Sequence, residues 1–237
     1  MEIEIYADVV CPWCYVGKVR LDAALATYPG EVTQRWRPFQ LDPGARSEPV
    51  VRRLARKFGG DDAARRMIER VTTAGAAEGL DFDFDRAMSA DTGNAHRLLW
   101  FADQPQAVFF GATADTQPRL AGVLYRAHFR DGLDVASTDV LTALAVEVGL
   151  EAGRIRRLLD SGEGASEVNV QLAQAHDLGI VAVPTFVFAG RYAVPGALDA
   201  TTLRSVLDEV ERLEGPASGP IPTQRPAGAS ADDSCLT

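Results

Sequence analysis

The stretch that decides the fold is Cys11-Pro12-Trp13-Cys14, which stands between a β-forming run and a helical pattern. The run before it, residues 3–10, is rich in Ile, Tyr and Val with partial alternation, and it predicts a strand. After the cysteines, Leu21 and Leu25 fall on one helical face. We therefore expect a strand that ends just before the cysteines and a helix that begins at them.

This arrangement puts Cys11 at a helix N-terminus, where unpaired backbone N–H groups and the helix dipole stabilise a thiolate. Cys14 follows one helical turn later, so we expect its sulfur to lie close enough for a disulfide. Pro12 suits the first turn because its missing N–H would be unpaired there in any case. Trp13 is expected to cover the dithiol and offer an apolar platform to a substrate, or else to be a partly exposed helix aromatic. The four residues predict a redox pair in which Cys11 is the nucleophile and Cys14 resolves the mixed disulfide.

The chain has three cysteines, which is too few for a disulfide framework. In a reducing compartment a C-x-x-C pair is catalytic or binds a metal. Zinc would need two further ligands, and the histidines at positions 96, 128 and 176 have no suitable spacing, so we expect no metal. Cys235 stands near the end of the chain, as a bystander thiol or as a partner for the active pair, and the sequence leaves both open.

The charge balance excludes some partners. The 237 residues include 33 acidic and 24 basic side chains, for a net charge of −9, which argues against nucleic acid or an anionic membrane as a partner. No apolar run approaches the roughly 18 residues that cross a bilayer. The chain begins Met1-Glu2-Ile3-Glu4, where a secretory signal would have a basic segment, so we expect a cytoplasmic protein. Monomer and homodimer are both open.

Further elements follow the cysteines. Residues 32–39 predict a second strand, parallel to the first through a right-handed crossover. Strands at 181–188 and 191–194 should form an antiparallel hairpin around Ala189-Gly190, and a last helix should cover 199–213. Between these flanks the predicted helices span 48–58, 61–79, 92–103, 113–130, 137–148, 151–160 and 163–178, with Ser137 or Thr138 as the N-cap of one. Phe82 and Phe84, set among aspartates, predict a loop with two aromatic anchors rather than a calcium loop.

These elements predict an α/β fold, with a four-stranded mixed sheet flanked by helices and a large all-helical insertion. Residues 1–44 and 163–213 would form the sheet domain, and residues 45–162 the inserted helical subdomain. Residues 214–237, rich in Pro, Gly, Ser and Ala, would be a flexible tail.

The chain resembles the thioredoxin superfamily, in particular its DsbA-type branch with a helical insertion and the cytosolic FrnE-like group of DsbA-family oxidoreductases. The resemblance covers residues 1–213. The motifs that carry it are C-P-W-C after the first strand, Trp36-Arg37-Pro38-Phe39-Gln40-Leu41, Ala95-His96-Arg97-Leu98 and Val183-Pro184-Thr185-Phe186.

The resemblance implies that Pro184 is cis and lies beside the dithiol, in a Val183-Pro184-Thr185 loop that binds substrate together with Pro12 and Trp13. Val183 would offer its backbone N–H and C=O to an extended substrate strand. A proline inside a strand-like run is unusual except at a strand start or bulge, and cis bonds are almost confined to X–Pro. The alternative is a trans proline that opens an edge strand.

The same branch includes glutathione-dependent 2-hydroxychromene-2-carboxylate isomerases and kappa-class glutathione transferases. Those proteins typically carry serine where this chain has Cys11, and an Asn-Thr pair where it has Asp91-Thr92. These two departures make the isomerase or transferase activity the weaker alternative.

We therefore expect a thiol–disulfide oxidoreductase that acts on a polypeptide or on a small thiol, with glutathione open as a co-substrate and no bound cofactor. Oxidase, reductase and isomerase directions share such a site and stay open. A chaperone-like peptide binder is a second alternative. His96 and Arg97 could serve near the dithiol or belong to a helix that only packs on the sheet domain.

Overall fold

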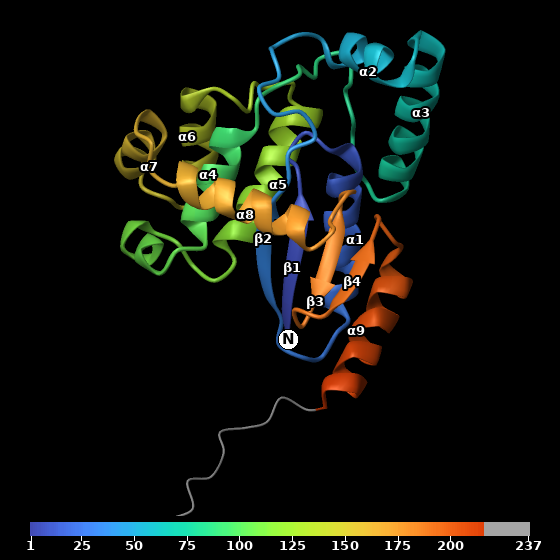
Figure 1. Cartoon of the computed structure of the whole chain (residues 1–237), viewed down its shortest axis with the longest axis vertical. Coiled ribbons are helices and arrows are strands. Elements are labelled where there is room, and N and C mark those ends of the chain that lie inside the picture. Colours follow the sequence, from blue (N-terminus) through green and yellow to red (C-terminus); the bar gives the residue numbers. More distant parts are fainter. Residues whose placement is uncertain (216–237) are drawn as a thin grey trace, which may run out of the picture.

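In the computed structural model, which describes residues 1–215, a four-stranded sheet has the order β2-β1-β3-β4 (Figure 1). Strand β1 (Glu2–Ala7) pairs in parallel with β2 (Thr33–Pro38) and antiparallel with β3 (Thr185–Phe188). Strand β4 (Tyr192–Pro195) pairs antiparallel with β3 and completes the hairpin. The predicted mixed sheet and the parallel β1–β2 pair are confirmed.

Helices account for most of the remaining described residues. Helix α1 (Pro12–Ala26) connects β1 to β2, and α9 (Ala200–Glu214) follows β4. Between β2 and β3 come the insertion and the helix that leads back to the sheet: α2 (Val50–Phe58), α3 (Asp61–Ala77), α4 (Gly93–Ala102), the 3-10 helix η1 (Pro105–Phe110), α5 (Thr116–Phe129), α6 (Thr138–Glu147), α7 (Ala152–Asp160) and α8 (Ala165–Asp177). The predicted fold with its helical insertion is confirmed.

The two faces of the sheet carry different helices because side chains alternate along a strand. On one face α1 and α9 contact each other, and their leucines share the main core with the strands (Figure 1). The buried residues of that layer are Ile3, Ile5, Leu21, Phe186, Phe188, Leu203 and Leu207. On the opposite face Tyr6 and Val187 pack with Ala175 of α8, which crosses the sheet there.

The boundaries of two strands differ from the predicted ones by several residues. The third strand begins at Thr185 rather than at residue 181, because Pro184 has no N–H for the strand ladder and Val181 is 86% exposed. The first strand ends at Ala7, since the Cys11 N–H donates to the Asp8 carbonyl oxygen (3.0 Å) and closes a turn. The 3-10 helix η1 was not predicted, because six residues are too few to show a helical period.

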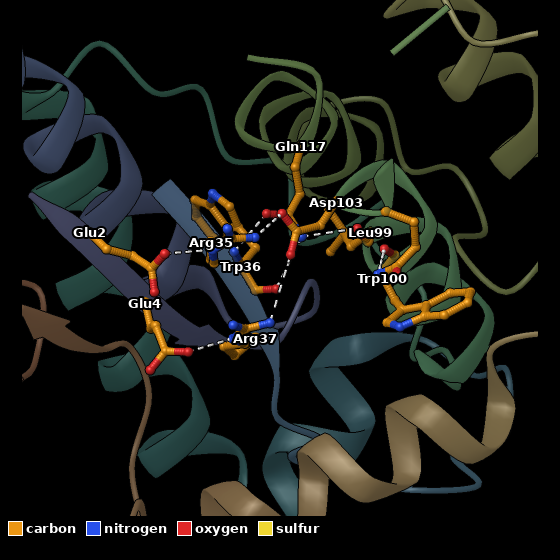
Figure 2. Close-up of polar contacts among 10 residues, drawn as sticks. Glu2, Glu4, Arg35, Trp36, Arg37, Leu99, Trp100, Asp103 and Gln117 are labelled. Carbon is orange, nitrogen blue, oxygen red and sulfur yellow. Dashed lines mark hydrogen bonds and ion pairs between the residues drawn. The ribbon is translucent and has the colours of Figure 1, made fainter. Parts of the chain in front are cut away.

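Gln117 of α5 protects the open edge of the sheet at β2 (Figure 2). Its Oε1 accepts from the Trp36 N–H (2.8 Å), and its Nε2 donates to the carbonyl oxygens of Trp36 (3.2 Å) and Leu99 (2.9 Å). The side-chain amide thus replaces one peptide group of a missing neighbouring strand. An edge paired in this way cannot accept a strand from another chain at that residue.

Ion pairs reinforce the same edge (Figure 2). Arg35 donates to Glu2 of β1 (2.7 Å) and to Asp103 behind α4 (2.8 Å). Arg37 donates to Glu4 (2.7 Å). These contacts hold β2 between its neighbour strand and the helical insertion.

An aromatic cluster joins α1 to the insertion. Tyr15 stacks on Tyr125 of α5 with ring centroids 5.2 Å apart, and its edge meets Phe82 at 5.8 Å. Phe82 and Phe84 both pack against Phe129, so the predicted aromatic anchors of this loop are confirmed. The N-cap at Ser137 is also confirmed, because its hydroxyl accepts from the Val140 N–H (3.5 Å).

Cys235 and most of the predicted tail lie outside the described residues. None of the helices within residues 1–215 is long and apolar enough to span a bilayer.

Candidate active site

Cys11 is the N-cap of α1, and Pro12 is the first helical residue. The Cys11 carbonyl oxygen accepts from the backbone N–H groups of Cys14 (3.0 Å) and Tyr15 (3.3 Å), which starts the first helical turn. Both cysteines are free thiols; Cys11 is 5% exposed and Cys14 1% exposed. Cys11 is therefore the more accessible sulfur, and it lies where α1 presents its unpaired N–H groups.

The loop before β3 lies against the dithiol. Cys11 Sγ is 3.8 Å from the carbonyl oxygen of Val183, and the Val183–Pro184 peptide bond is cis. The Pro184 carbonyl oxygen accepts from the Gly196 N–H (2.7 Å), which ties the loop to the turn after β4. Among residues 1–215 no acceptor pairs with the Val183 N–H, so this backbone donor is available beside Cys11.

Gly17 lets α1 approach this loop closely. A Cβ at position 17 would lie 2.9 Å from Pro184 Cγ and 3.3 Å from the Phe186 ring. Contacts that short require the loop or the helix to shift. Because Gly17, one turn beyond Cys14, has no side chain, the dithiol and the Val183 backbone can lie this close together.

Thr185 is buried, and its hydroxyl donates to the Ala182 carbonyl oxygen (2.8 Å). This bond closes the loop on itself. Thr185 therefore acts on the loop's shape, whereas Val183 carries the free backbone N–H.

Cys14 faces the protein interior. Burial raises the pKa of the Cys14 thiol well above its ordinary value, and a hydrogen bond to the Cys11 sulfur raises it further. A buried thiol resists ionisation because the thiolate loses its hydration. Cys14 consequently stays protonated at neutral pH in the reduced protein and must lose its proton to react.

Asp8 is a fully buried carboxylate in the turn before Cys11. Its Oδ2 accepts from the Leu41 N–H (2.7 Å), and its Oδ1 is 3.4 Å from His96 Nε2. Within the described chain that Oδ1 has no hydrogen-bond partner. The negative charge of Asp8 contributes to the raised pKa of Cys14, so the carboxylate lies within electrostatic reach of the resolving thiol.

His96 contacts the turn that precedes the dithiol, whereas Arg97 contacts the end of α7. The His96 ring Nε2 is 3.1 Å from the Phe39 carbonyl oxygen as well as near Asp8, so this side chain joins α4 to the turn that carries the cysteines. Arg97 lies at the other side of α4, where it donates to the carbonyl oxygens of Glu163 (2.8 Å), Ser161 (2.6 Å) and Leu158. Arg97 thus pairs the carbonyl groups that the end of α7 leaves without partners.

Helix α5 carries two further buried polar groups, of which Tyr125 is near Cys14. The Tyr125 hydroxyl has no hydrogen-bond partner among the described residues. Burial raises its pKa well above the ordinary value, with a further contribution from the Cys14 charge. Both ring nitrogens of His128, one turn along α5, are likewise without partners in residues 1–215, and burial lowers the His128 pKa to about 4. The ring is therefore neutral at physiological pH.

Trp13 is half-buried and lies at the open side of the site. It lines a hollow of about 460 Å³ together with Arg66, Glu69, Arg70 and Thr73 of α3. Trp13 therefore faces a space that a substrate can enter, at the end of the motif where the insertion approaches α1.

The sequence interpretation missed Asp8, Gly17, Tyr125 and the α3 side chains. Asp8 had a usable signal, because an acidic residue within an apolar strand run is unexpected unless it has a role. The others had none, since each acts through a contact with a segment far away in the sequence. Across residues 1–215 no three His, Cys, Asp and Glu side chains gather as a metal site would require.

The mixed sheet, the cis-proline loop and the cysteine pair at the first helix together define a thioredoxin-fold protein. The chain belongs to the DSBA-like thioredoxin domain family, whose model matches residues 2–208. The predicted DsbA-type family is thereby confirmed, and it supports an oxidoreductase or a related enzyme.

Solved structures agree with this family. The chain is similar to a probable DsbA oxidoreductase from Streptomyces coelicolor, at 31% identity and a TM-score of 0.82, covering 98% of this chain and 100% of that one. It shares its fold with the cytosolic disulfide reductase DsbM from Pseudomonas aeruginosa, at 19% identity and a TM-score of 0.60, over 90% and 100% of the two chains. The same fold occurs in a 2-hydroxychromene-2-carboxylate isomerase, at 15% identity and a TM-score of 0.65, over 90% and 98%.

Proposed function

We propose that the protein is a cytoplasmic thiol–disulfide oxidoreductase that acts through Cys11 and Cys14. One observation carries the proposal: Cys11 caps a helix and lies 3.8 Å from the Val183 carbonyl oxygen, while Cys14 is sealed behind it. The Cys11 sulfur is the less buried of the two and lies beside a free backbone donor, with a second sulfur one turn behind it. Such an arrangement suits exchange rather than packing.

The reaction proceeds in two exchanges. The Cys11 thiolate attacks one sulfur of a substrate disulfide, the substrate S–S bond breaks, and the released substrate thiolate takes up a proton. Cys14 then loses its proton, attacks the Cys11 sulfur of the mixed disulfide and releases the second substrate thiolate. Two electrons pass to the substrate, and the Cys11–Cys14 disulfide remains. The same steps in reverse oxidise a dithiol substrate, so the direction depends on the reduction potential of the pair.

Asp8 is the proposed proton acceptor for Cys14. The carboxylate is buried, it is within electrostatic reach of the thiol, and its Oδ1 has no hydrogen-bond donor among the described residues. Cys14 has to ionise in a place that disfavours charge. A nearby base removes the need for hydroxide to reach the interior.

The substrate is a polypeptide in extended form or a small thiol such as glutathione, and no bound cofactor is needed. The free Val183 N–H supports pairing with a substrate strand in the manner of strand addition. The fold likeness to DsbM, one structure of which carries glutathione, supports a small-thiol partner in the cytoplasm.

Reduction of insulin and refolding of a scrambled disulfide protein test the proposal directly. We expect Cys11→Ser to abolish both activities and Cys14→Ser to trap a mixed disulfide that non-reducing gels detect. Full exchange activity in Cys11→Ser would overturn the assignment. The reduction potential of the pair, measured in glutathione buffers, gives the direction.

A glutathione-dependent isomerase or transferase is the second candidate, favoured by the shared fold with the chromene carboxylate isomerase. In this chain Asp91 closes a loop, because its two oxygens accept from the N–H groups of Gly44 (2.6 Å) and Gly93 (2.8 Å). Glutathione-dependent isomerisation of 2-hydroxychromene-2-carboxylate that survives Cys11→Ser would favour this candidate. Suppression of aggregation that survives loss of both sulfurs would instead favour a chaperone-like peptide binder.

A further inference from the structure

The hollow beside Trp13 is lined by one face of α3. Arg66, Glu69, Arg70 and Thr73 recur at spacings of three and four residues, so they form one stripe along the helix. The opposite face of α3 is buried at Ala64, Val71 and Gly75, and α3 contacts α1 (Figure 1). The stripe lines the hollow together with Trp13, which precedes Cys14 in the first turn of α1.

Helix α3 is firmly held in this position. Arg20 of α1 donates to Glu78, at the end of α3, at 2.6 Å, and both side chains are largely shielded from solvent. A Cβ at Gly75 would clash with the Phe82 ring, so the loop after α3 packs directly on the helix backbone. The part of the α3 backbone that carries the stripe consequently has a fixed position relative to α1.

Arg66 and Arg70 have no ion-pair partner among the described residues, although many other arginines of the chain do. Arg65, their neighbour on the same helix, pairs with Asp62 at 3.3 Å. Glu69 also lines the hollow and is likewise outside any ion pair in residues 1–215, which leaves the stripe with an excess of one positive charge. The chain as a whole has a net charge of −9, so two unpaired arginines next to Trp13 are opposite in sign to most of its surface.

We propose that Arg66 and Arg70 bind a carboxylate carried by the disulfide substrate, so that the enzyme selects anionic substrates at this hollow. The inference rests on the proposed thiol–disulfide exchange and names its substrate class. The space of about 460 Å³ holds a side chain or a small peptide fragment next to Trp13. A carboxylate can lie between two guanidinium groups one turn apart and accept hydrogen bonds from both.

A carboxylate next to the reactive disulfide can come from an acidic peptide or from oxidised glutathione. Both present the same chemistry to the two arginines, so the experiment includes an arm for each. The unpaired cations also attract such a substrate before contact, an effect that salt screens.

The test measures kcat/KM for the reduction of three cyclic disulfide peptides whose disulfide is flanked by Glu, Gln or Lys, with dithiothreitol regenerating the full-length enzyme. We expect the wild type to prefer the Glu peptide over the Gln peptide by about fivefold, as expected from two exposed charge pairs. Arg66→Gln/Arg70→Gln should bring this ratio to about one. The double reversal Arg66→Glu/Arg70→Glu should make the Lys peptide the preferred one. Sodium chloride at high concentration should reduce the wild-type preference.

Arg65→Gln is the matched control, because it removes the same charge from the same helix outside the stripe. We expect it to retain the wild-type ratio, and Glu69→Gln to increase the ratio. A parallel arm with oxidised glutathione identifies the source: a rate that falls in the double variant only with glutathione indicates the small thiol, and one that falls only with peptides indicates a polypeptide.

The results that would overturn this inference differ from the result that would overturn the proposed function. Equal Glu-to-Gln ratios in wild type and double variant, together with an unchanged glutathione rate, would overturn this inference. Equal losses in Arg65→Gln would overturn it too. Absence of any Cys11-dependent reduction, even of the neutral peptide, would instead overturn the proposed function.

Discussion

Cys11 Sγ lies 3.8 Å from the Val183 carbonyl oxygen, although 172 residues separate them in the chain. The sulfur comes from the first helix and the carbonyl from the loop before the third strand, so the site exists only in the folded sheet. Cys11 is 5% exposed at this contact, and Cys14 lies behind it at 1%. The different environments of the two sulfurs lead to the first prediction.

Iodoacetamide at pH 7.5 should modify Cys11 and spare Cys14. Burial raises the pKa of the Cys14 thiol well above its ordinary value, so at this pH Cys14 is protonated as well as inaccessible. The measurement is mass spectrometry of the reduced protein in a Cys235→Ser background, which removes the third thiol. Denatured protein should react at both positions, and equal labelling in the native state would contradict the prediction.

Gly17→Ala should destabilise the protein by about 2 kcal/mol, because the new Cβ would press on the Pro184 ring and on Phe186. It should also slow disulfide exchange, since the loop that carries Val183 has to move. Urea unfolding and the insulin assay check both effects. Gly122→Ala is the control: its Cβ would meet only the flexible end of Lys18, so α5 should be unchanged or slightly more stable.

The sequence predicted local features well and distant contacts poorly. Pro12 after Cys11 correctly predicted the start of a helix, and Ser137 correctly predicted an N-cap, because such signals act within one helical turn. The start of β3 was misplaced, since residues 181–184 are as apolar as the strand itself. The strand cannot begin before Pro184, because proline has no N–H for the ladder. The conformation of the loop also depends on its contact with α1, which is distant in the sequence.

The candidate site divides in the same manner. Cys11 and Cys14 stand out by their spacing. The residues around Arg66 and Tyr125 give no local signal that either side chain lies near a motif more than fifty residues earlier. His96 and Arg97 are adjacent, yet one faces Asp8 and the other the end of α7. The roles of His96 and Arg97 differ only because α4 packs between the turn that carries Asp8 and the end of α7.

Gln117→Leu should lower the free energy of unfolding by about 3 kcal/mol. The leucine leaves the Trp36 N–H and two carbonyl oxygens without partners at a buried sheet edge. Gln117→Glu should also be destabilising, because a carboxylate can accept from the Trp36 N–H but cannot donate to the two carbonyl groups. Urea unfolding monitored by tryptophan fluorescence measures both. Wild-type stability in Gln117→Leu would show that water replaces the amide.

Stability should fall as the pH is lowered from about 6.5 to about 4, by as much as about 3 kcal/mol from His128 alone. Burial lowers the His128 pKa to about 4, so the unfolded chain binds a proton in this range that the folded chain does not. The contribution is complete above pH 6.5 and disappears as the pH approaches the folded value. Urea unfolding of wild type and His128→Leu at pH 7 and 4.5 tests this. The variant should show the smaller loss, and an identical loss would assign the effect to other groups.

Asp8→Asn should slow the step in which Cys14 attacks the mixed disulfide. The amide cannot accept the thiol proton, and it also removes a negative charge that contributes to the raised Cys14 pKa. The two consequences oppose each other in the rate and separate by pH: near neutral pH the missing base dominates, whereas at alkaline pH hydroxide replaces it and the lower Cys14 pKa favours attack. We therefore expect turnover to be reduced at pH 7 and to recover as the pH rises, with alkylation of Cys11 unchanged.

Asp91→Asn is the control, because it makes the same chemical change in a loop where the carboxylate only accepts hydrogen bonds from Gly44 and Gly93. It should leave the pH profile as in wild type. A pH profile in Asp8→Asn that matches wild type would mean that Asp8 does not take the proton from Cys14.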